Sequence, residues 1–141
     1  MIQANRRDYR TAFKKHLHAY SNWGDTGSLT SKRLILVYCV ECGLKYSIMD
    51  SERIYSVSEA QIDIQNDLHS HNIYKLLKRL NQSGNYVFHR IETIHGDNVD
   101  PNTFHQICRY CVPLIDDHEK YLKEYDEQLG RIVLWLKERV Y

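Results

Sequence analysis

The sequence predicts an all-α fold, an antiparallel bundle of about five helices in a single domain, residues 1–141. Apolar residues recur in several stretches with the 3.6-residue period of an α-helix, and no segment alternates convincingly enough to form a competing sheet. Only two prolines and six glycines occur, which leaves room for long helices. A chain of 141 residues suffices for one hydrophobic core but not for two.

The first two predicted helices differ in character. Residues 5–21 form an amphipathic helix, because apolar side chains recur every three or four positions. A turn rich in Gly and Asp follows. Residues 29–49 are apolar on almost every side in their later part, which is typical of a central, buried helix. Ser28 or Thr30 can cap this helix, and Gly43 in its middle predicts close approach of a neighbouring helix.

The middle of the chain is harder to interpret. Residues 51–68 suggest a loop with at most one helical turn. Residues 70–82 carry a periodic Ile and Leu pattern and predict a third helix, which a Ser-Gly-Asn sequence ends. Residues 86–99 have apolar positions without a clear period, so no element is assigned to them.

Two further helices are predicted near the end of the chain. Asp100 suits a helix cap and Pro101 suits the first helical position, so a fourth helix runs from there through Cys111. Pro113 interrupts the pattern. The last helix covers about 114–139 and has the most regular apolar stripe of the chain.

Composition and charge exclude several classes of protein. The formal net charge is +1, and 43% of residues are apolar, so neither a strongly basic protein nor a disordered chain is indicated. No stretch reaches the roughly 18 apolar residues of a membrane span. The polar, basic N-terminal residues lack the apolar region of a secretory signal. We therefore expect a cytoplasmic protein without membrane association, whose cysteines are reduced.

Basic residues gather near the N-terminus. Residues 1–33 hold seven Arg or Lys and two acidic residues. Arg6, Arg7, Arg10 and Lys14 could form a patch that binds RNA phosphates, and an ordinary solvated helix face is the alternative.

The four cysteines form two pairs, Cys39-x-x-Cys42 and Cys108-x-x-Cys111. Their number and spacing suggest a zinc site of four thiolates. Both pairs, however, lie within apolar helical stretches, where a free cysteine is an ordinary core residue. We therefore expect no metal and no cofactor.

Three segments resemble the HEPN domain family of helical bundles. The first, Tyr-Cys-Val-Glu-Cys-Gly-Leu-Lys from Tyr38 to Lys45, is similar to that family's Tyr-x-Val-Glu-x-x-Leu-Lys pattern. The second, His71-Asn-Ile-Tyr-Lys-Leu-Leu, resembles a His-Asp-Leu-x-x-Leu-Leu segment, and the third is Arg109-Tyr110. The resemblance implies a HEPN-like bundle. Many members are metal-independent ribonucleases of toxin or antiviral defence systems, many act as dimers, and some are non-catalytic adaptor modules.

The catalytic pattern of the family is an Arg followed, after four to six residues, by a His. Here eight residues separate Arg109 from His118, and a proline lies between them. The only literal match, Arg90 to His95, lies upstream of the expected position. The resemblance therefore leaves two hypotheses open, a metal-independent endoribonuclease that binds RNA or a non-catalytic adaptor that pairs with itself or another protein.

The candidate catalytic residues follow from the chemistry of RNA cleavage. A histidine can withdraw the 2′-hydroxyl proton, and an arginine can stabilise the charged phosphorane. Arg109 could act with His105, four residues away on the same helix, or with His118. Alternatively, Arg109 is buried and paired with Glu41, and the histidine is satisfied within the core. The resemblance, together with apolar residues on several faces of 104–112, predicts a homodimer with this segment near the interface.

Overall fold

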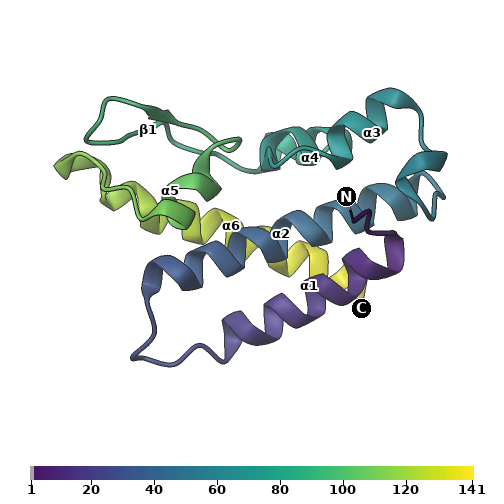
Figure 1. The fold of residues 1–141 in the computed structure, drawn as a ribbon, viewed down its shortest axis with the longest axis horizontal. Helices are drawn as coiled ribbons and strands as arrows, with labels where there is room; N and C mark the ends of the chain where they lie inside the picture. Colours follow the sequence, from purple (N-terminus) through teal and green to yellow (C-terminus); the bar gives the residue numbers. More distant parts are fainter. Residues whose placement is uncertain (1) are drawn as a thin grey trace.

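The computed structural model describes residues 2–141, and these residues form a mostly helical protein, which confirms the all-α class (Figure 1). Three short 3₁₀ turns and one small antiparallel hairpin complete the described structure. No helix within residues 2–141 is long and apolar enough to cross a membrane. The α-helices are α1 (Arg6–Ser21), α2 (Leu29–Ser51), α3 (Ile62–Leu68), α4 (Ile73–Arg79), α5 (Phe104–Tyr110) and α6 (Lys120–Val140), and the strands are β1 (Ile91–Glu92) and β2 (Asn98–Val99).

Side-chain caps fix where the first two helices begin. At α1, the Asn5 side chain accepts the Asp8 N–H, and the Asp8 carboxylate accepts the Asn5 N–H, both at 3.0 Å. This reciprocal capping box satisfies two of the free N–H groups at the helix start. At α2, the Ser28 hydroxyl accepts the Ser31 N–H at 3.3 Å, so Ser28 rather than Thr30 is the cap.

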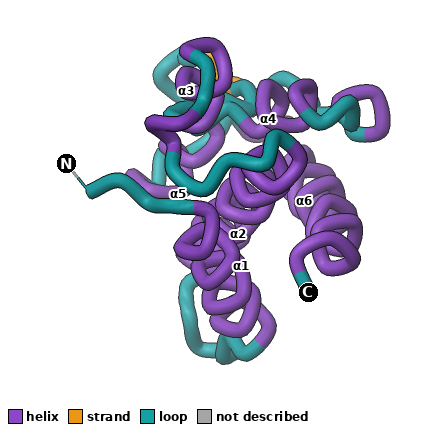
Figure 2. Tube along the Cα trace, turned by 90° about the vertical axis from the view of Figure 1, so that its right-hand side faces the viewer, coloured by secondary structure: helices purple, strands orange, loops and turns teal. Residues whose placement is uncertain are grey.

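Helix α2 lies at the centre and contacts α1, α4, α5 and α6 (Figure 2). Its predicted burial is confirmed, because most of its residues from Leu36 to Met49 are buried. Helix α1 runs antiparallel to α2, whereas α6 runs parallel to it. An Arg33–Asp126 ion pair joins the starts of α2 and α6, and Arg139 contacts Ser51 at their ends. The bundle is therefore only partly antiparallel.

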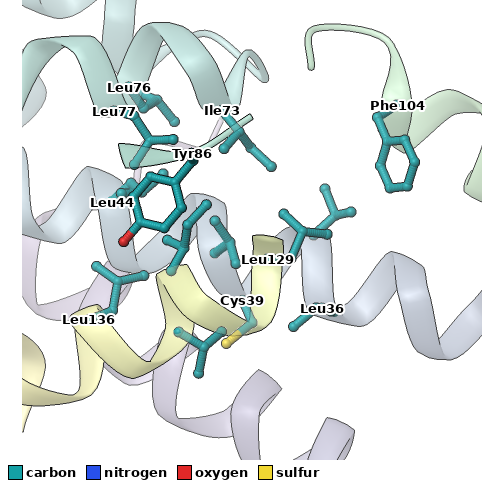
Figure 3. Packing of buried hydrophobic residues seen from close by; sticks show 14 of the residues in the cluster. Leu36, Cys39, Leu44, Ile73, Leu76, Leu77, Tyr86, Phe104, Leu129 and Leu136 are labelled. Carbon is teal, nitrogen blue, oxygen red and sulfur yellow. The ribbon is translucent and has the colours of Figure 1, made fainter. Parts of the chain in front are cut away.

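Neighbouring helices approach the α2 backbone closely at Gly43. A Cβ atom at this position would come within 2.6 Å of Leu136 Cδ1 and 2.7 Å of Phe13 Cδ2. The close approach predicted there is confirmed, since side chains of α1 and α6 occupy the space above the glycine. Figure 3 shows Leu44 of α2, Leu77 of α4 and Leu136 of α6 pointing into the same continuous cluster.

Two segments of the middle region differ from the sequence prediction. Within 51–68 a 3₁₀ turn and α3 are formed, and α3 buries Ile64 and Leu68 one helical turn apart. Residues 86–99 include the hairpin, in which Ile91 pairs with Val99. The hairpin loop contains Gly96 with a φ of 86°, a conformation that favours glycine. A hairpin with two-residue strands is too short to give a visible alternation in the sequence.

The last two helices begin later than predicted. The Asp100 carboxylate accepts the N–H groups of Asn102 and Thr103, so it stabilises a turn, and α5 starts only at Phe104. Residues before α6 pair with the hairpin: the Ile94 N–H donates to the Pro113 carbonyl, and the Ile115 N–H to the Glu92 carbonyl. These hydrogen bonds hold 113–115 extended, and a 3₁₀ turn over Asp116–His118 follows, so α6 starts only at Lys120.

Candidate active site

A polar stripe interrupts the apolar surface of α2. Tyr38, Glu41 and Lys45 lie three and four residues apart, so they share one face of the helix. Glu41 and Lys45 are only 5% and 7% exposed. Burying a charge is costly unless partners compensate for the lost water. The buried Glu41 carboxylate therefore needs a charged or hydrogen-bonding partner.

The partner of Glu41 is His71. Its Nδ1 atom lies 3.2 Å from Glu41 Oε2, while the His71 side chain remains 50% exposed. The loop before α4 holds the histidine in place: Ser70 Oγ accepts the Asn72 N–H, and the Asn72 side chain caps α4 by accepting the Lys75 N–H. His71 thus stands at the surface with a buried carboxylate behind it.

A second histidine lies behind the first. The ring centroids of His71 and His105 are 4.7 Å apart, and His105 is 4% exposed. The His105 Nδ1 atom is buried without a hydrogen-bond partner. Burial lowers the pKa of His105, and the positive charges of His71 and Arg109 lower it further. His105 is therefore disposed to be neutral, and its burial keeps it from solvent.

Arg109 lies at the open side of the same group. It is exposed, and its Nη2 atom donates a hydrogen bond of 2.8 Å to the Tyr38 hydroxyl. The expected buried ion pair with Glu41 is not formed, because Glu41 instead binds His71. The position of Arg109 in the last turn of α5 is consistent with its exposure: the helix ends at Tyr110, and Cys111 then turns the chain away with a φ of 54°.

Basic side chains surround one buried carboxylate in this site. Burial raises the pKa of Glu41 above its ordinary value, and Lys45, His71 and Arg109 only partly offset this rise. An ionised Glu41 can only accept a hydrogen bond, so it would hold His71 with the proton on Nδ1. The free Nε2 lone pair could then accept a proton. The exposed Arg109 guanidinium, whose charge acts on Glu41 and His105 of the same group, could hold an anion.

The other predicted catalytic residues lie outside this group. His118 Nδ1 accepts the Glu92 N–H at 2.9 Å, and its ring meets the edge of Tyr121, so it anchors the hairpin. Arg90 and His95 are exposed residues of the hairpin segment. None of these three has a hydrogen bond or ring contact with Arg109.

Three of the four predicted RNA-binding residues of α1 contact the protein itself. Arg6 lies over the Tyr55 ring, and Lys14 lies over the Tyr141 ring at 4.7 Å. The Arg10 Nε atom donates to the Val140 carbonyl at 2.8 Å, which satisfies an otherwise free group at the end of α6. Arg7 is exposed. Binding of RNA by these residues stays a prediction.

The Cys39 and Cys108 thiols have different polar groups beside them. The Cys39 thiol lies 3.6 Å from the Phe13 carbonyl, whereas Cys108 is close to the Arg33–Asp126 ion pair. Burial raises the pKa of Cys39 and Cys108 to about 12, which keeps both thiols protonated. Within residues 2–141, no three His, Cys, Asp or Glu side chains are arranged to hold a metal ion.

Sequence reasoning assigned no chemical role to His71 or Tyr38, although both begin segments that resemble HEPN motifs. The sequence pattern indicated His105 and Arg109 as candidates. In the structure, His105 lies beside His71, and Arg109 binds Tyr38. The segment 104–112, expected at a dimer interface, directs Phe104 and Ile107 into its own core. Dimerisation stays a prediction.

Comparisons with protein-family models, curated proteins and solved structures gave no match to this chain.

Proposed function

We propose that this protein is a metal-independent endoribonuclease in which His71 is the general base and Arg109 binds the scissile phosphate. One observation carries the proposal: a half-exposed histidine is bound through Nδ1 to a buried carboxylate, in the same polar group as an exposed arginine. RNA cleavage without a metal needs a general base and a cation that stabilises the phosphorane, and a carboxylate bound to the histidine fixes the orientation of that base. The HEPN resemblance of the segments that supply these residues adds support and suggests a role in a toxin or antiviral defence system.

The reaction follows from the roles of these groups. His71 Nε2 takes the proton of an RNA 2′-hydroxyl, and the 2′-oxygen attacks the adjacent phosphorus. The bond between phosphorus and the 5′-oxygen breaks, and the departing oxygen takes a proton from water. The products are a 2′,3′-cyclic phosphate and a 5′-hydroxyl. Arg109, oriented by its hydrogen bond to Tyr38, stabilises the negative charge that develops on the phosphoryl oxygens.

The test compares variants in the cleavage of a labelled, single-stranded RNA of mixed sequence in the presence of EDTA. His71→Asn keeps an N–H that can reach Glu41 but removes the base, so cleavage should fall by about 100-fold or more. Arg109→Ala should cause a loss of similar size. Thermal melts of both variants should remain close to that of the wild type, because the new asparagine keeps a donor for Glu41 and the Arg109 side chain is exposed.

The alternative catalytic residues provide matched controls. Arg90→Ala and His95→Asn change the same residue types at exposed positions of the hairpin segment and should leave cleavage intact. Loss of cleavage in these controls, but not in His71→Asn, would place the chemistry at the other pair. A folded wild-type protein that cleaves no RNA would favour the non-catalytic adaptor.

A further inference from the structure

A cavity of about 410 Å³ lies beside the proposed site, between the hairpin and α5. Its volume falls within the range of about 300–1,000 Å³ that is common for ligand sites. The lining combines buried apolar side chains, Val99 and Ile107, with the polar side chains of Asp97, Asn98 and Gln106. The lining contains no Lys or Arg, so the cavity itself does not suit a phosphate.

Hydrogen bonds hold the hairpin side of this cavity in place. The buried Thr93 hydroxyl accepts the N–H groups of His95 and Asp97, which fixes the loop of the hairpin. The next residue, Ile94, donates its N–H to the Pro113 carbonyl. On the opposite side, the α5 backbone is fixed by its buried residues. The cavity is therefore preformed, and a ligand would not need to order its walls.

The cavity adjoins the proposed catalytic arginine through Tyr110. This tyrosine is 66% exposed and lines the cavity. The Arg109 guanidinium carbon lies 6.0 Å from the centre of the Tyr110 ring. On α5, His105 and Arg109 form one row, while Gln106 and Tyr110 form the adjacent row. The first row faces the polar group on α2, and the second row faces the cavity.

We propose that this cavity binds a nucleobase of single-stranded RNA next to the phosphate held by Arg109, an inference that rests on the proposed function. The exposed Tyr110 ring offers a surface on which a base can stack. The amides of Asn98 and Gln106 can both donate and accept hydrogen bonds, and Asp97 can accept them, as the polar edge of a base requires. A carboxylate in the cavity repels phosphate, so the base enters while the backbone remains at Arg109.

Binding can be tested without cleavage. Fluorescence anisotropy would measure the affinity of 2′-O-methyl hexanucleotides, which lack the 2′-hydroxyl that cleavage needs. Tyr110→Ala should weaken binding by roughly 5- to 150-fold, the loss expected for one stacked base. The matched control is Tyr74→Ala, which removes an exposed tyrosine of α4 outside the cavity. An oligomer with an abasic backbone of the same length should bind more weakly than the hexanucleotide.

Photo-crosslinking of a hexanucleotide that carries 5-iodouracil should label a peptide within 93–112. Equal affinities of Tyr110→Ala and Tyr74→Ala, or equal binding of the abasic and normal oligomers, would overturn the proposal. A mononucleotide that binds as tightly as the hexanucleotide would also overturn it, in favour of a free-nucleotide site. If Tyr110→Ala and the abasic oligomer bind more weakly as expected, but the wild type cleaves no RNA, the proposed ribonuclease activity would be refuted. The proposed base-binding cavity would still be supported.

Discussion

A methyl group added at Gly43 should destabilise the protein, whereas the same methyl group added at Gly130 should stabilise it. Both glycines lie inside long helices, Gly43 in α2 and Gly130 in α6. In each case, replacing Gly with Ala favours the helix by about 1 kcal/mol. The two positions differ only in what the new methyl group meets, so the pair isolates the effect of packing.

The structure sets the size of the difference. At Gly43 the new Cβ atom would lie 2.6 Å from Leu136 and 2.7 Å from Phe13, both of which are fully buried. Relieving this overlap should cost about 1–3 kcal/mol, and its central value of about 2 kcal/mol exceeds the gain of about 1 kcal/mol in helix propensity. At Gly130 no heavy atom lies within 4 Å, so the gain is retained. The free energies of unfolding of the two variants should therefore differ by about 2 kcal/mol.

Urea denaturation of Gly43→Ala, Gly130→Ala and the wild type would measure this difference, and thermal melts should separate the variants by roughly 8 °C. The melting temperatures should fall in the order Gly130→Ala, wild type, Gly43→Ala. If Gly43→Ala were as stable as Gly130→Ala, then Phe13 and Leu136 could not occupy the space above α2, and the described packing of α1 and α6 would be wrong.

Three further predictions concern other parts of the core. Tyr125→Phe keeps the ring stacked at 3.9 Å on Phe104 and removes a buried hydroxyl without a partner, so chemical denaturation should show a gain of about 1 kcal/mol. His105 has a lowered pKa, so the stability it contributes is present above its unfolded pKa of about 6.5 and is lost as pH falls through the lower folded pKa. Melts between pH 7.5 and 5 should therefore fall more steeply for the wild type than for His105→Gln, and equal slopes would contradict this. Asp126→Asn weakens a two-pronged ion pair with the largely buried Arg33, so the free energy of unfolding should drop by roughly 1–2 kcal/mol in urea, and no change would refute the pairing of α2 with α6.

Sequence periodicity identified the long helices because each presents several turns to the core. Helix α1 was predicted to within one residue. The burial of α2 was predicted because its own residues are apolar on almost every side. Helix α3 was missed because its seven residues give barely two turns of pattern. The parallel direction of α6 relative to α2 depends on contacts such as Arg33–Asp126, which no local pattern encodes.

The candidate site was predictable only in part, for a similar reason. The i, i+4 spacing of His105 and Arg109 placed them on one face of a helix from the sequence alone. The role of His71 depends on Glu41, which lies 30 residues earlier in the chain, and only the packing of α4 against α2 brings the two side chains together. In this packing Glu41 pairs with His71, and Arg109 remains exposed at the surface.

The most direct test of the central claim is the chemistry of the RNA ends that the wild-type protein produces in EDTA. Attack by a 2′-hydroxyl whose proton has passed to His71 predicts fragments with a 2′,3′-cyclic phosphate and a 5′-hydroxyl, and predicts that 2′-O-methyl RNA of the same sequence stays intact. His71→Asn should produce almost none of these fragments. Cleavage of the 2′-O-methyl RNA, or equal cleavage of RNA by wild type and His71→Asn, would contradict the proposed mechanism.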